Sequence, residues 1–293
     1  MLAQNIVPKI NEIAVTGFNL QAEAYECRFL GPLNDTPCPY CGRSTWPETA
    51  RPSYPDAAVA LLKENLHLVP GQSHVLDLAA GTGKFTRLIA GHGYRLSAVE
   101  PAPVMREKFA TVLPDVPIQE GTAWKIPFKD QSLDAVIIAQ AFHWFDDLPA
   151  LREIRRVLKP GGYLGLIWNM EDKNARQWVA RIRSFYEVYD TDVPQYRNGG
   201  WRKVWKTDEA ASLFHPMESQ FVYHETLDDY DTIWRRVLSK SYVSVLPKDK
   251  LEEIRKGIFA VLEDPEGDIE IDPATGLVRF PYETEVVWVQ RKD

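Results

Sequence analysis

The sequence predicts an α/β protein with a mainly parallel, doubly wound sheet. Between residues 55 and 169, short apolar runs alternate with amphipathic segments whose apolar residues have helical spacing. Pairs such as Pro70-Gly71 separate these segments. Strands that alternate with helices form parallel sheets covered on both faces, with right-handed connections. We therefore expect one large α/β unit within the 293 residues.

The expected elements follow one another as strand and helix. The expected strands are His74–Leu78, Leu96–Val99, Val116–Gln119, Leu133–Ala139 and Tyr163–Trp168. The expected helices are Asp56–Leu68, Lys84–Ala90, Val104–Leu113 and Asp147–Leu158, the last of them ended by Gly161-Gly162. Two later β-like runs, Gln220–His224 and Thr284–Val289, are expected to complete the far edge of the sheet.

Composition excludes several classes of function. Forty-one acidic and thirty-four basic residues give a net charge of −7, which argues against a nucleic-acid-binding surface. Apolar runs are too short to cross a membrane, and Met1–Leu20 lacks the pattern of a secretory signal. Three cysteines are too few for a disulfide framework. We expect a cytoplasmic enzyme without a membrane or nucleic-acid partner.

A glycine turn follows the first expected strand. Gly81 and Gly83 allow a tight turn and a close approach of a ligand to the backbone, and the next helix offers unpaired N–H groups. A phosphate-binding P-loop would need Ser or Thr where Phe85 stands, and a dinucleotide-binding loop would have Gly or Ala at Thr86. S-Adenosylmethionine needs neither residue, and Asp77 is placed to meet its ammonium group. A plain strand–helix turn is the alternative.

The second strand ends at Glu100, about 20 residues beyond the glycines. A carboxylate there can accept hydrogen bonds from both ribose hydroxyls of a nucleoside ligand. Nicotinamide enzymes use an acid at the same place, and a solvated charge at the start of a helix is the structural alternative. Glu100 therefore indicates a nucleoside ligand without identifying it.

Several ordered motifs together are more specific. The segments 75–86, 98–101, 119–128, 134–136, 140–145 and 158–162 resemble the class I S-adenosylmethionine-dependent methyltransferases. The likeness is to methyltransferase type 11 and to the small-molecule branch that includes trans-aconitate methyltransferase-like enzymes. It covers Arg51 to Asn169 and continues more weakly to the C-terminal run. The resemblance implies a seven-stranded Rossmann-like sheet with S-adenosylmethionine as cofactor.

The resemblance also implies roles for residues. It assigns Asp77, Ala79, Gly81 and Gly83 to the methionine end of the cofactor, Glu100 and Pro101 to the ribose, Thr122 and Ala123 to the adenine, and Gln140 and Phe142 to the region beneath the sulfonium. Many relatives have an aspartate at the adenine position, where this chain has Gly121-Thr122. We therefore expect the adenine contacts to depend on backbone groups.

The segment that follows the fourth strand is the expected place of methyl transfer, because ligands of open α/β sheets lie at the carboxyl ends of the strands. His143 is the candidate general base or orienting group, with a packed core histidine as the alternative. Trp144 is expected to form the wall of the acceptor pocket, or else to pack in the core. Further pocket contacts are expected from aromatic residues of the C-terminal half: Tyr186, Tyr189, Trp201, Trp205 and Trp234.

The N-terminal residues 1–54 are expected to form a flap over the cofactor. Tyr25-Glu26 and the later Arg51-Pro52 run resemble the two halves of the flap motif, and Tyr25 is assigned to the substrate. Residues 27–49 separate these halves and hold all three cysteines. Zinc needs four ligands, so we expect an irregular loop insertion and no metal.

The sequence thus predicts a methyltransferase domain over residues 55–293, in which 171–293 shape the acceptor pocket and complete the sheet. The expected reaction is methylation of a small-molecule acceptor on oxygen, nitrogen or a carboxylate. A methyltransferase-like protein that binds the cofactor with little or no turnover is the alternative, and a nicotinamide oxidoreductase is disfavoured by Thr86.

Overall fold

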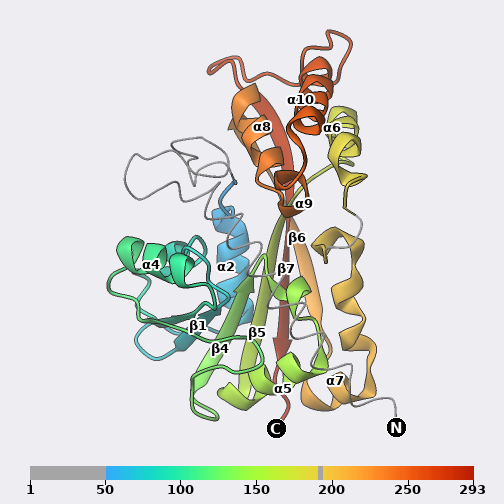
Figure 1. The fold of residues 1–293 in the computed structure, drawn as a ribbon. Helices are drawn as coiled ribbons and strands as arrows, with labels where there is room; N and C mark the ends of the chain where they lie inside the picture. The colour runs from blue at the N-terminus through green and yellow to red at the C-terminus, as the bar shows by residue number, and fades with distance from the viewer. Residues whose placement is uncertain (1–50, 191–193) are drawn as a thin grey trace, which may run out of the picture.

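A seven-stranded sheet forms the centre of the molecule (Figure 1). The computed structural model describes residues 51–190 and 194–293. The strand order is β3-β2-β1-β4-β5-β7-β6, in which β1 to β5 are parallel and β7 is antiparallel to both of its neighbours. The strands are β1 (His74–Leu78), β2 (Arg95–Val99), β3 (Ile118–Gln119), β4 (Leu133–Ala139), β5 (Leu158–Glu171), β6 (Glu218–Asp228) and β7 (Val278–Gln290). The prediction of a mainly parallel seven-stranded fold is confirmed.

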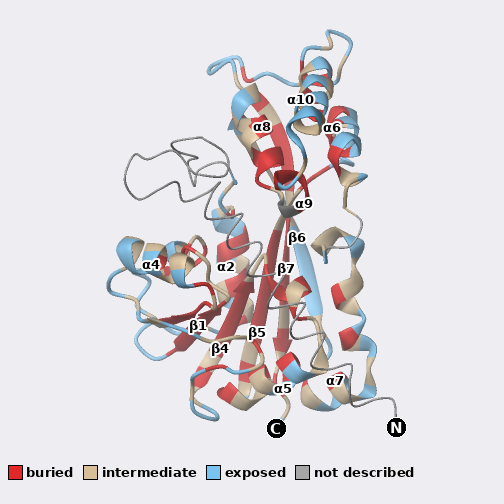
Figure 2. Cartoon of the chain, in the orientation of Figure 1, coloured by how far each residue is buried: buried red, intermediate tan, exposed pale blue. Residues whose placement is uncertain are grey.

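Helices cover both faces of the sheet. Alternate residues of the central strands point to opposite faces, so each strand contributes side chains to two cores. Val75 of β1 packs in a core with α2 (Asp56–Asn65) and α3 (Thr86–Ile89). Leu76, the next residue, packs in a second core with α5 (Leu148–Val157) on the other face. Figure 2 shows the central strands buried between these layers. The helices α4 (Pro103–Val112) and α7 (Asp208–Leu213) complete the main body.

β5 differs from its prediction. It begins at Leu158, directly after α5, so Gly161-Gly162 lies inside the strand and does not end the helix. The pairing with β4 shifts between Leu133 and Ala135, where β5 contains extra residues. Gly161 has a φ of +70°, and a Cβ on Gly162 would lie 2.9 Å from the carbonyl oxygen of Lys159. The two glycines therefore form a bulge that sequence patterning alone read as a helix end.

The C-terminal half builds a helical cap with a core of its own. This cap consists of α6 (Gln177–Glu187), α8 (Tyr230–Leu238), α9 (Ser241–Ser244) and α10 (Lys248–Leu262), which pack on the first residues of β7. β5 runs into α6, so the cap lies beyond the carboxyl ends of the parallel strands (Figure 1). Short 3₁₀ turns, η4 (Tyr196–Asn198), η5 (Gly200–Arg202) and η6 (Val204–Lys206), lead from the cap back to α7. The cap therefore lies beyond the carboxyl end of β5, on the side of the sheet at which the sequence predicts the site.

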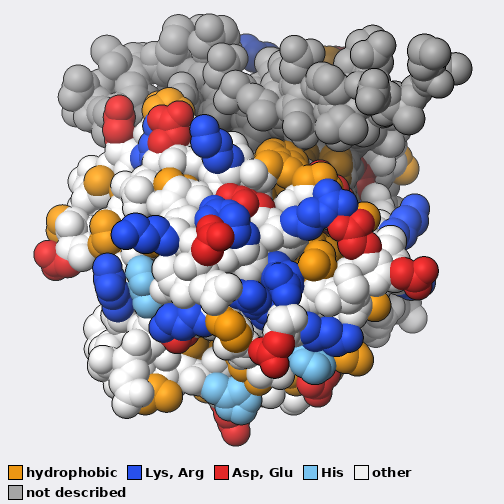
Figure 3. Space-filling model, turned by 90° about the horizontal axis from the view of Figure 1, so that it is seen from below, with side chains coloured by type: hydrophobic (Ala, Val, Ile, Leu, Met, Phe, Trp, Pro, Cys, Tyr) orange, Lys and Arg blue, Asp and Glu red, His pale blue; other side chains and the backbone are white. Residues whose placement is uncertain are grey.

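The opposite end of the molecule, seen from below in Figure 3, shows lysine and arginine side chains interspersed with acidic ones. No helix within the described residues has the length and apolar character needed to cross a membrane.

The absence of a side chain at Gly83 is expected to stabilise the fold, because α4 and the residue after it pack closely against this position. A Cβ there would lie 2.7 Å from Leu113 Cδ1 and 2.9 Å from Phe109 Cδ2, and the φ of +81° is already unfavourable for other residues. Gly71 has a similar φ of +77° with nothing within 4 Å, which makes it a matched control. Gly83→Ala should lower the free energy of unfolding by about 1–3 kcal/mol more than Gly71→Ala, because only Gly83 is crowded. Equal losses in urea unfolding would contradict this.

Candidate active site

The candidate site lies at the switch point of the sheet, where successive strands stop being added on one side of β1 and continue on its other side. From β1 the chain continues to β2 and β3 on one side, and β4 then pairs with the other side of β1. In such sheets ligands bind at the carboxyl ends of the strands beside this switch point. Ala79 and Gln140, which directly follow β1 and β4, both have a φ of +59°. Left-handed backbone at residues other than glycine costs about 1–3 kcal/mol and concentrates at functional sites.

Gly81 and Gly83 of the first turn have different surroundings. Gly83 packs against α4, as described above. Gly81 has a φ of +56°, and among the described residues a Cβ there would meet only Met105 Sδ, at 3.8 Å. The described part of the chain therefore leaves space over Gly81, which is what close approach of a ligand requires.

Asp77 is a buried carboxylate with one unused oxygen. Its Oδ2 accepts a hydrogen bond of 2.5 Å from Thr86 Oγ1, whereas its Oδ1 is buried without a partner among the described residues. Burial raises the pKa of Asp77 to about 7, and the nearby Glu100 adds to this effect. Thr86, the residue that departs from the dinucleotide-binding pattern, thus orients Asp77. A cationic group such as an ammonium would satisfy the free oxygen.

Glu100 ends β2 beside this turn and is almost completely buried. Its Oε2 accepts a hydrogen bond from the Gly81 N–H at 2.9 Å, and its Oε1 accepts one from the Ala102 N–H at 3.0 Å. Burial raises the pKa of Glu100 to about 7, although the two backbone N–H groups partly offset this rise. Each carboxylate oxygen keeps a lone pair that a hydroxyl can use. Glu100 therefore braces the glycine turn and still has capacity for a ligand.

The loop after β3 lies beside the end of β2. Pro101 continues from Glu100 toward α4, and its carbonyl accepts a hydrogen bond of 2.6 Å from Arg106 Nη1. Thr122 and Lys125 exchange two backbone hydrogen bonds, of 3.2 and 3.1 Å, around the buried Ala123. The turn that holds the predicted adenine contacts is therefore fixed by its own backbone.

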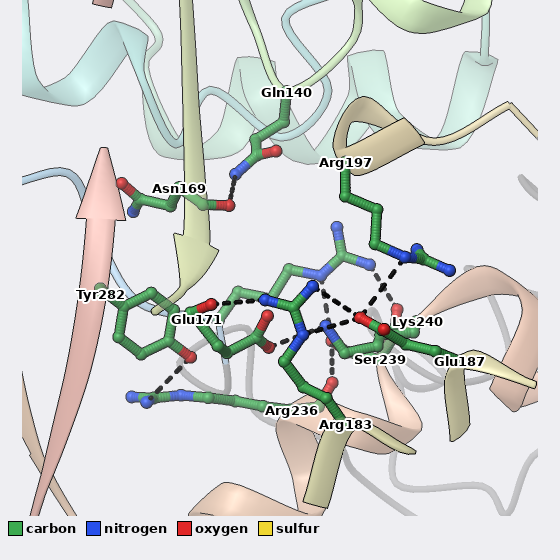
Figure 4. A network of polar contacts seen from close by, with 11 residues as sticks. Gln140, Asn169, Glu171, Arg183, Glu187, Arg197, Arg236, Ser239, Lys240 and Tyr282 are labelled. Carbon is green, nitrogen blue, oxygen red and sulfur yellow. Dashed lines mark hydrogen bonds and ion pairs between the residues drawn. The ribbon is translucent and has the colours of Figure 1, made fainter. Parts of the chain in front are cut away.

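Gln140 connects the ends of β4 and β5. Its Nε2 donates a hydrogen bond of 2.9 Å to the carbonyl of Asn169 (Figure 4). Asn169 in turn donates from Nδ2 to the carbonyl of Ser53 at 2.8 Å and accepts a bond of 2.5 Å from Thr284 Oγ1. These hydrogen bonds thus connect the ends of β4 and β5 with β7 and with the backbone before α2.

The segment Phe142–Trp144 forms the 3₁₀ turn η3. Phe142 is fully buried, and Trp144 is half-buried against the same core. His143 is also buried, and its Nδ1 accepts a hydrogen bond of 3.3 Å from Trp168 Nε1. Burial lowers the pKa of His143 to about 3, with a smaller contribution from Arg51. These features are those of a neutral, packed histidine, which is the alternative that the sequence left open.

Charged residues join the cap to the sheet (Figure 4). Glu171, the last residue of β5, is buried and forms an ion pair of 2.7 Å with Lys240 of the cap. Arg183 Nη1 donates a bond of 2.6 Å to the backbone carbonyl of Glu171. Burial alone would raise the pKa of Glu171, but the Lys240 ammonium and the Arg183 guanidinium lower it to about 2. The junction is therefore an ionised, hydrogen-bonded network.

Arg51 adds a second link. Its Nε donates a hydrogen bond of 3.0 Å to Ser239 Oγ in the cap, and its backbone carbonyl accepts one from Lys84 Nζ, next to the glycine turn. The cap, the first described residues and the glycine turn are thus connected through one side chain and its backbone.

Comparison with known proteins agrees with this geometry. A family model described as a methyltransferase domain matches residues 76–166. An uncharacterized methyltransferase-like protein of Schizosaccharomyces pombe is 34% identical over 208 residues, which are 71% of this chain and 79% of that protein. The chain belongs to the class I S-adenosylmethionine-dependent methyltransferases.

Other proteins similar to this methyltransferase either match a smaller part of the chain or resemble it only in fold. An uncharacterized methyltransferase of Mycobacterium tuberculosis is 44% identical over 135 residues, 46% of this chain and 53% of that protein, so the match spans about half of the relative. A solved structure from Anaeromyxobacter dehalogenans has a TM-score of 0.57 and 21% identity, covering 82% of this chain and 97% of that one. The YcgJ protein of Bacillus subtilis has a TM-score of 0.51 and 19% identity, covering 81% and 99%.

The residues present fit the cofactor of this methyltransferase family. The unpartnered Asp77 Oδ1 can accept a hydrogen bond from an ammonium group, the space over Gly81 admits a ligand, and Glu100 has capacity for hydroxyls. All three lie at the carboxyl ends of β1 and β2. The structure thus brings together the residues that the resemblance assigned to the methionine and ribose ends.

The sequence did not reveal the junction between cap and sheet in this methyltransferase. Lys240 lies 69 residues after Glu171, and neither these two residues nor Arg183 belong to a motif. The predicted pocket aromatics divide between the two cores: Tyr186 and Trp234 lie in the core of the cap, and Trp201 lies in the core of the main body. Tyr25 and the predicted insertion 27–49 lie outside the described residues.

Gly81→Val is expected to remove cofactor binding while the protein still folds. The side chain would occupy the open space over the turn, where its nearest protein neighbour is 3.8 Å away. Gly91→Val is the control, because Gly91 has a φ of +79° and nothing within 4 Å. Calorimetric titration with S-adenosylhomocysteine should show binding by the Gly91 variant and none by the Gly81 variant. Normal binding by a folded Gly81→Val protein would reduce the glycine turn to a structural feature.

Cofactor affinity is expected to depend on pH. Asp77 and Glu100 both have pKa values raised to about 7, so each is partly protonated at neutral pH in the ligand-free protein. The ammonium of S-adenosylhomocysteine requires an ionised Asp77, so binding should strengthen as pH rises through 7. Affinity should be about tenfold higher at pH 8 than at pH 6, the ratio for one proton released near pH 7. Asp77→Asn should reduce the dependence, and constant affinity in the native protein would contradict it.

Proposed function

We propose that this protein transfers a methyl group from S-adenosylmethionine to a small-molecule acceptor. The observation that carries the proposal is the buried Asp77 with one unpartnered oxygen, directly before the open space over Gly81. Burying a carboxylate in this way is costly unless a cation completes its hydrogen bonds. The location at the switch point of the sheet supports the same ligand.

The cofactor supplies a methyl group on a positively charged sulfur, which is activated for in-line displacement. The contribution of the protein is then to position the acceptor and to exclude water. Asp77 and Glu100 would hold the amino-acid and ribose ends, and Gln140 and Phe142 would form the floor near the sulfonium. The cap lies beyond the carboxyl end of β5 and would border the acceptor.

The acceptor is proposed to react at oxygen, nitrogen or a carboxylate. His143 is a weak base, since its pKa is lowered to about 3 and Trp168 already donates to its Nδ1. This favours acceptor atoms that are nucleophilic without loss of a proton to His143. Two relatives are named as demethylmenaquinone methyltransferases, such as the one from Thermotoga maritima, 38% identical over 116 residues, but these matches cover about half of each relative and select no acceptor.

Binding of S-adenosylhomocysteine, measured by titration calorimetry, is the first test. The native protein should bind it and should not bind NAD. Glu100→Gln should weaken binding by about 1–3 kcal/mol, the loss expected when a charged hydrogen-bond acceptor becomes neutral. Glu120→Gln is the control, because that exposed carboxylate pairs with Arg106 at the surface. Equal affinity of the Glu100 variant and the native protein would remove Glu100 from the site.

Turnover separates the proposal from the alternative of a binding protein. With a radiolabelled methyl donor and a mixture of small carboxylates, amines and phenols, label should pass to a small molecule in an amount that grows with time. Binding of S-adenosylhomocysteine without transfer to any class would support a methyltransferase-like protein that has lost turnover.

A further inference from the structure

The outermost strand, β6, has one edge that no strand of residues 51–190 or 194–293 pairs with. β7 pairs with all eleven residues of β6 along its other edge. At about 3.4 Å per residue, the remaining edge presents roughly 35 Å of backbone hydrogen-bonding groups. Such an edge is a template for another strand.

β6 carries three carboxylates, Glu218, Glu225 and Asp228, but lacks the other usual devices that prevent edge pairing. Glu218–Asp228 contains no proline, lysine or glycine, and its pairing with β7 has no register shift. Three large apolar side chains are instead exposed, with exposed fractions of 38% for Phe221, 67% for Tyr223 and 42% for Leu227. The rings of Phe221 and Tyr223 stack at 6.3 Å, so they form one apolar ridge on a single face of the strand.

The sequence of β6 is complementary to itself in one antiparallel register. With a two-fold axis at Val222, residues whose numbers add to 444 lie opposite each other. Phe221 then faces Tyr223 of the second copy, and Tyr223 faces its Phe221. Glu225 lies opposite Ser219, and Glu218 lies opposite Thr226, so no two carboxylates meet. Aromatic pairs across strands stabilise a sheet, whereas opposed like charges destabilise it.

The neighbouring register is less favourable. A shift that places Tyr223 opposite itself would put Glu218 opposite Asp228 and Phe221 opposite Glu225. Two pairs of carboxylates would then repel each other across the symmetric interface. Charge therefore disfavours this shift, and the two Phe221–Tyr223 pairs favour the register centred on Val222.

We propose that a second copy of this chain pairs with β6 in this antiparallel register and joins the two sheets into one. A two-fold axis makes the contact isologous, as in most homodimers. The candidate active site lies at β1 and β4, which β5 and β7 separate from β6. Dimer formation should therefore leave cofactor binding unchanged, and the proposal stands or falls independently of the proposed function.

Register-specific cross-linking is the direct test. Residues directly opposite each other in an antiparallel pair have Cα atoms about 4.5–5.5 Å apart, within the reach of a disulfide. In a background with Cys27, Cys38 and Cys41 changed to serine, Val222→Cys should form a covalent dimer on mild oxidation. Leu227→Cys is the control, because residue 227 lies opposite residue 217 and far from its own copy. Cross-linking by Leu227→Cys and not by Val222→Cys would overturn the register.

Sedimentation of the native protein and of a matched pair of variants tests the interface. Tyr223 and Val245 are both 67% exposed, but only Tyr223 lies on β6. Tyr223→Lys should raise the dissociation constant of the dimer about tenfold, because two aromatic pairs are lost by symmetry. Val245→Lys should leave it unchanged, and all proteins should bind S-adenosylhomocysteine equally. A native protein that stays monomeric, or equal effects of the two lysines, would overturn the proposal.

Discussion

The buried carboxylate of Glu100 fixes the first two strand–helix connections of the sheet relative to each other. One of its oxygens accepts the N–H of Gly81 and the other accepts the N–H of Ala102, so the glycine turn and the start of α4 share one side chain. Asp77, bound by Thr86, lies in the same buried region and feels the charge of Glu100. Two carboxylates with pKa values near 7 in one place are costly in an empty protein. A cationic ligand with hydroxyl groups offsets this cost, which is why the arrangement is better explained as a binding site than as a structural brace.

The second constraint is the junction between the cap and the sheet. The cap has its own apolar core, so it needs few apolar contacts with the main body. Its position depends instead on polar contacts at the end of β5: the ion pair of Glu171 with Lys240 and the bond from Arg183. Arg51 joins the same cap to the glycine turn through Ser239 and Lys84. Breaking one partner of a buried pair leaves an uncompensated charge, so these contacts fix the cap over the carboxyl edge. The proposed acceptor site thus depends on the same residues that join the two cores.

The position of β7 determines which strand forms the far edge of the sheet. It lies antiparallel between β5 and β6, so the last strand in sequence is not the last strand in space. This leaves β6 outermost, with Phe221 and Tyr223 exposed on one face. The same topology keeps the candidate active site, at β1 and β4, away from that edge. The proposed active site and the proposed dimer interface therefore lie in opposite parts of one sheet.

The sequence by itself determined the order of strands and helices from β1 to β5, because apolar periodicity and glycine turns are local signals. It also singled out Asp77, Gly81 and Glu100 as candidates, and the fold brings them together at the carboxyl ends of β1 and β2. It misread Gly161-Gly162, since a glycine pair inside a bulge and one after a helix look alike until β4 is paired with β5. Tertiary structure alone decided that Gly83 packs against α4, that His143 is buried beside Trp168, and that Glu171 meets Lys240. These properties depend on burial and on neighbours distant in the chain, and no local pattern of residues encodes either.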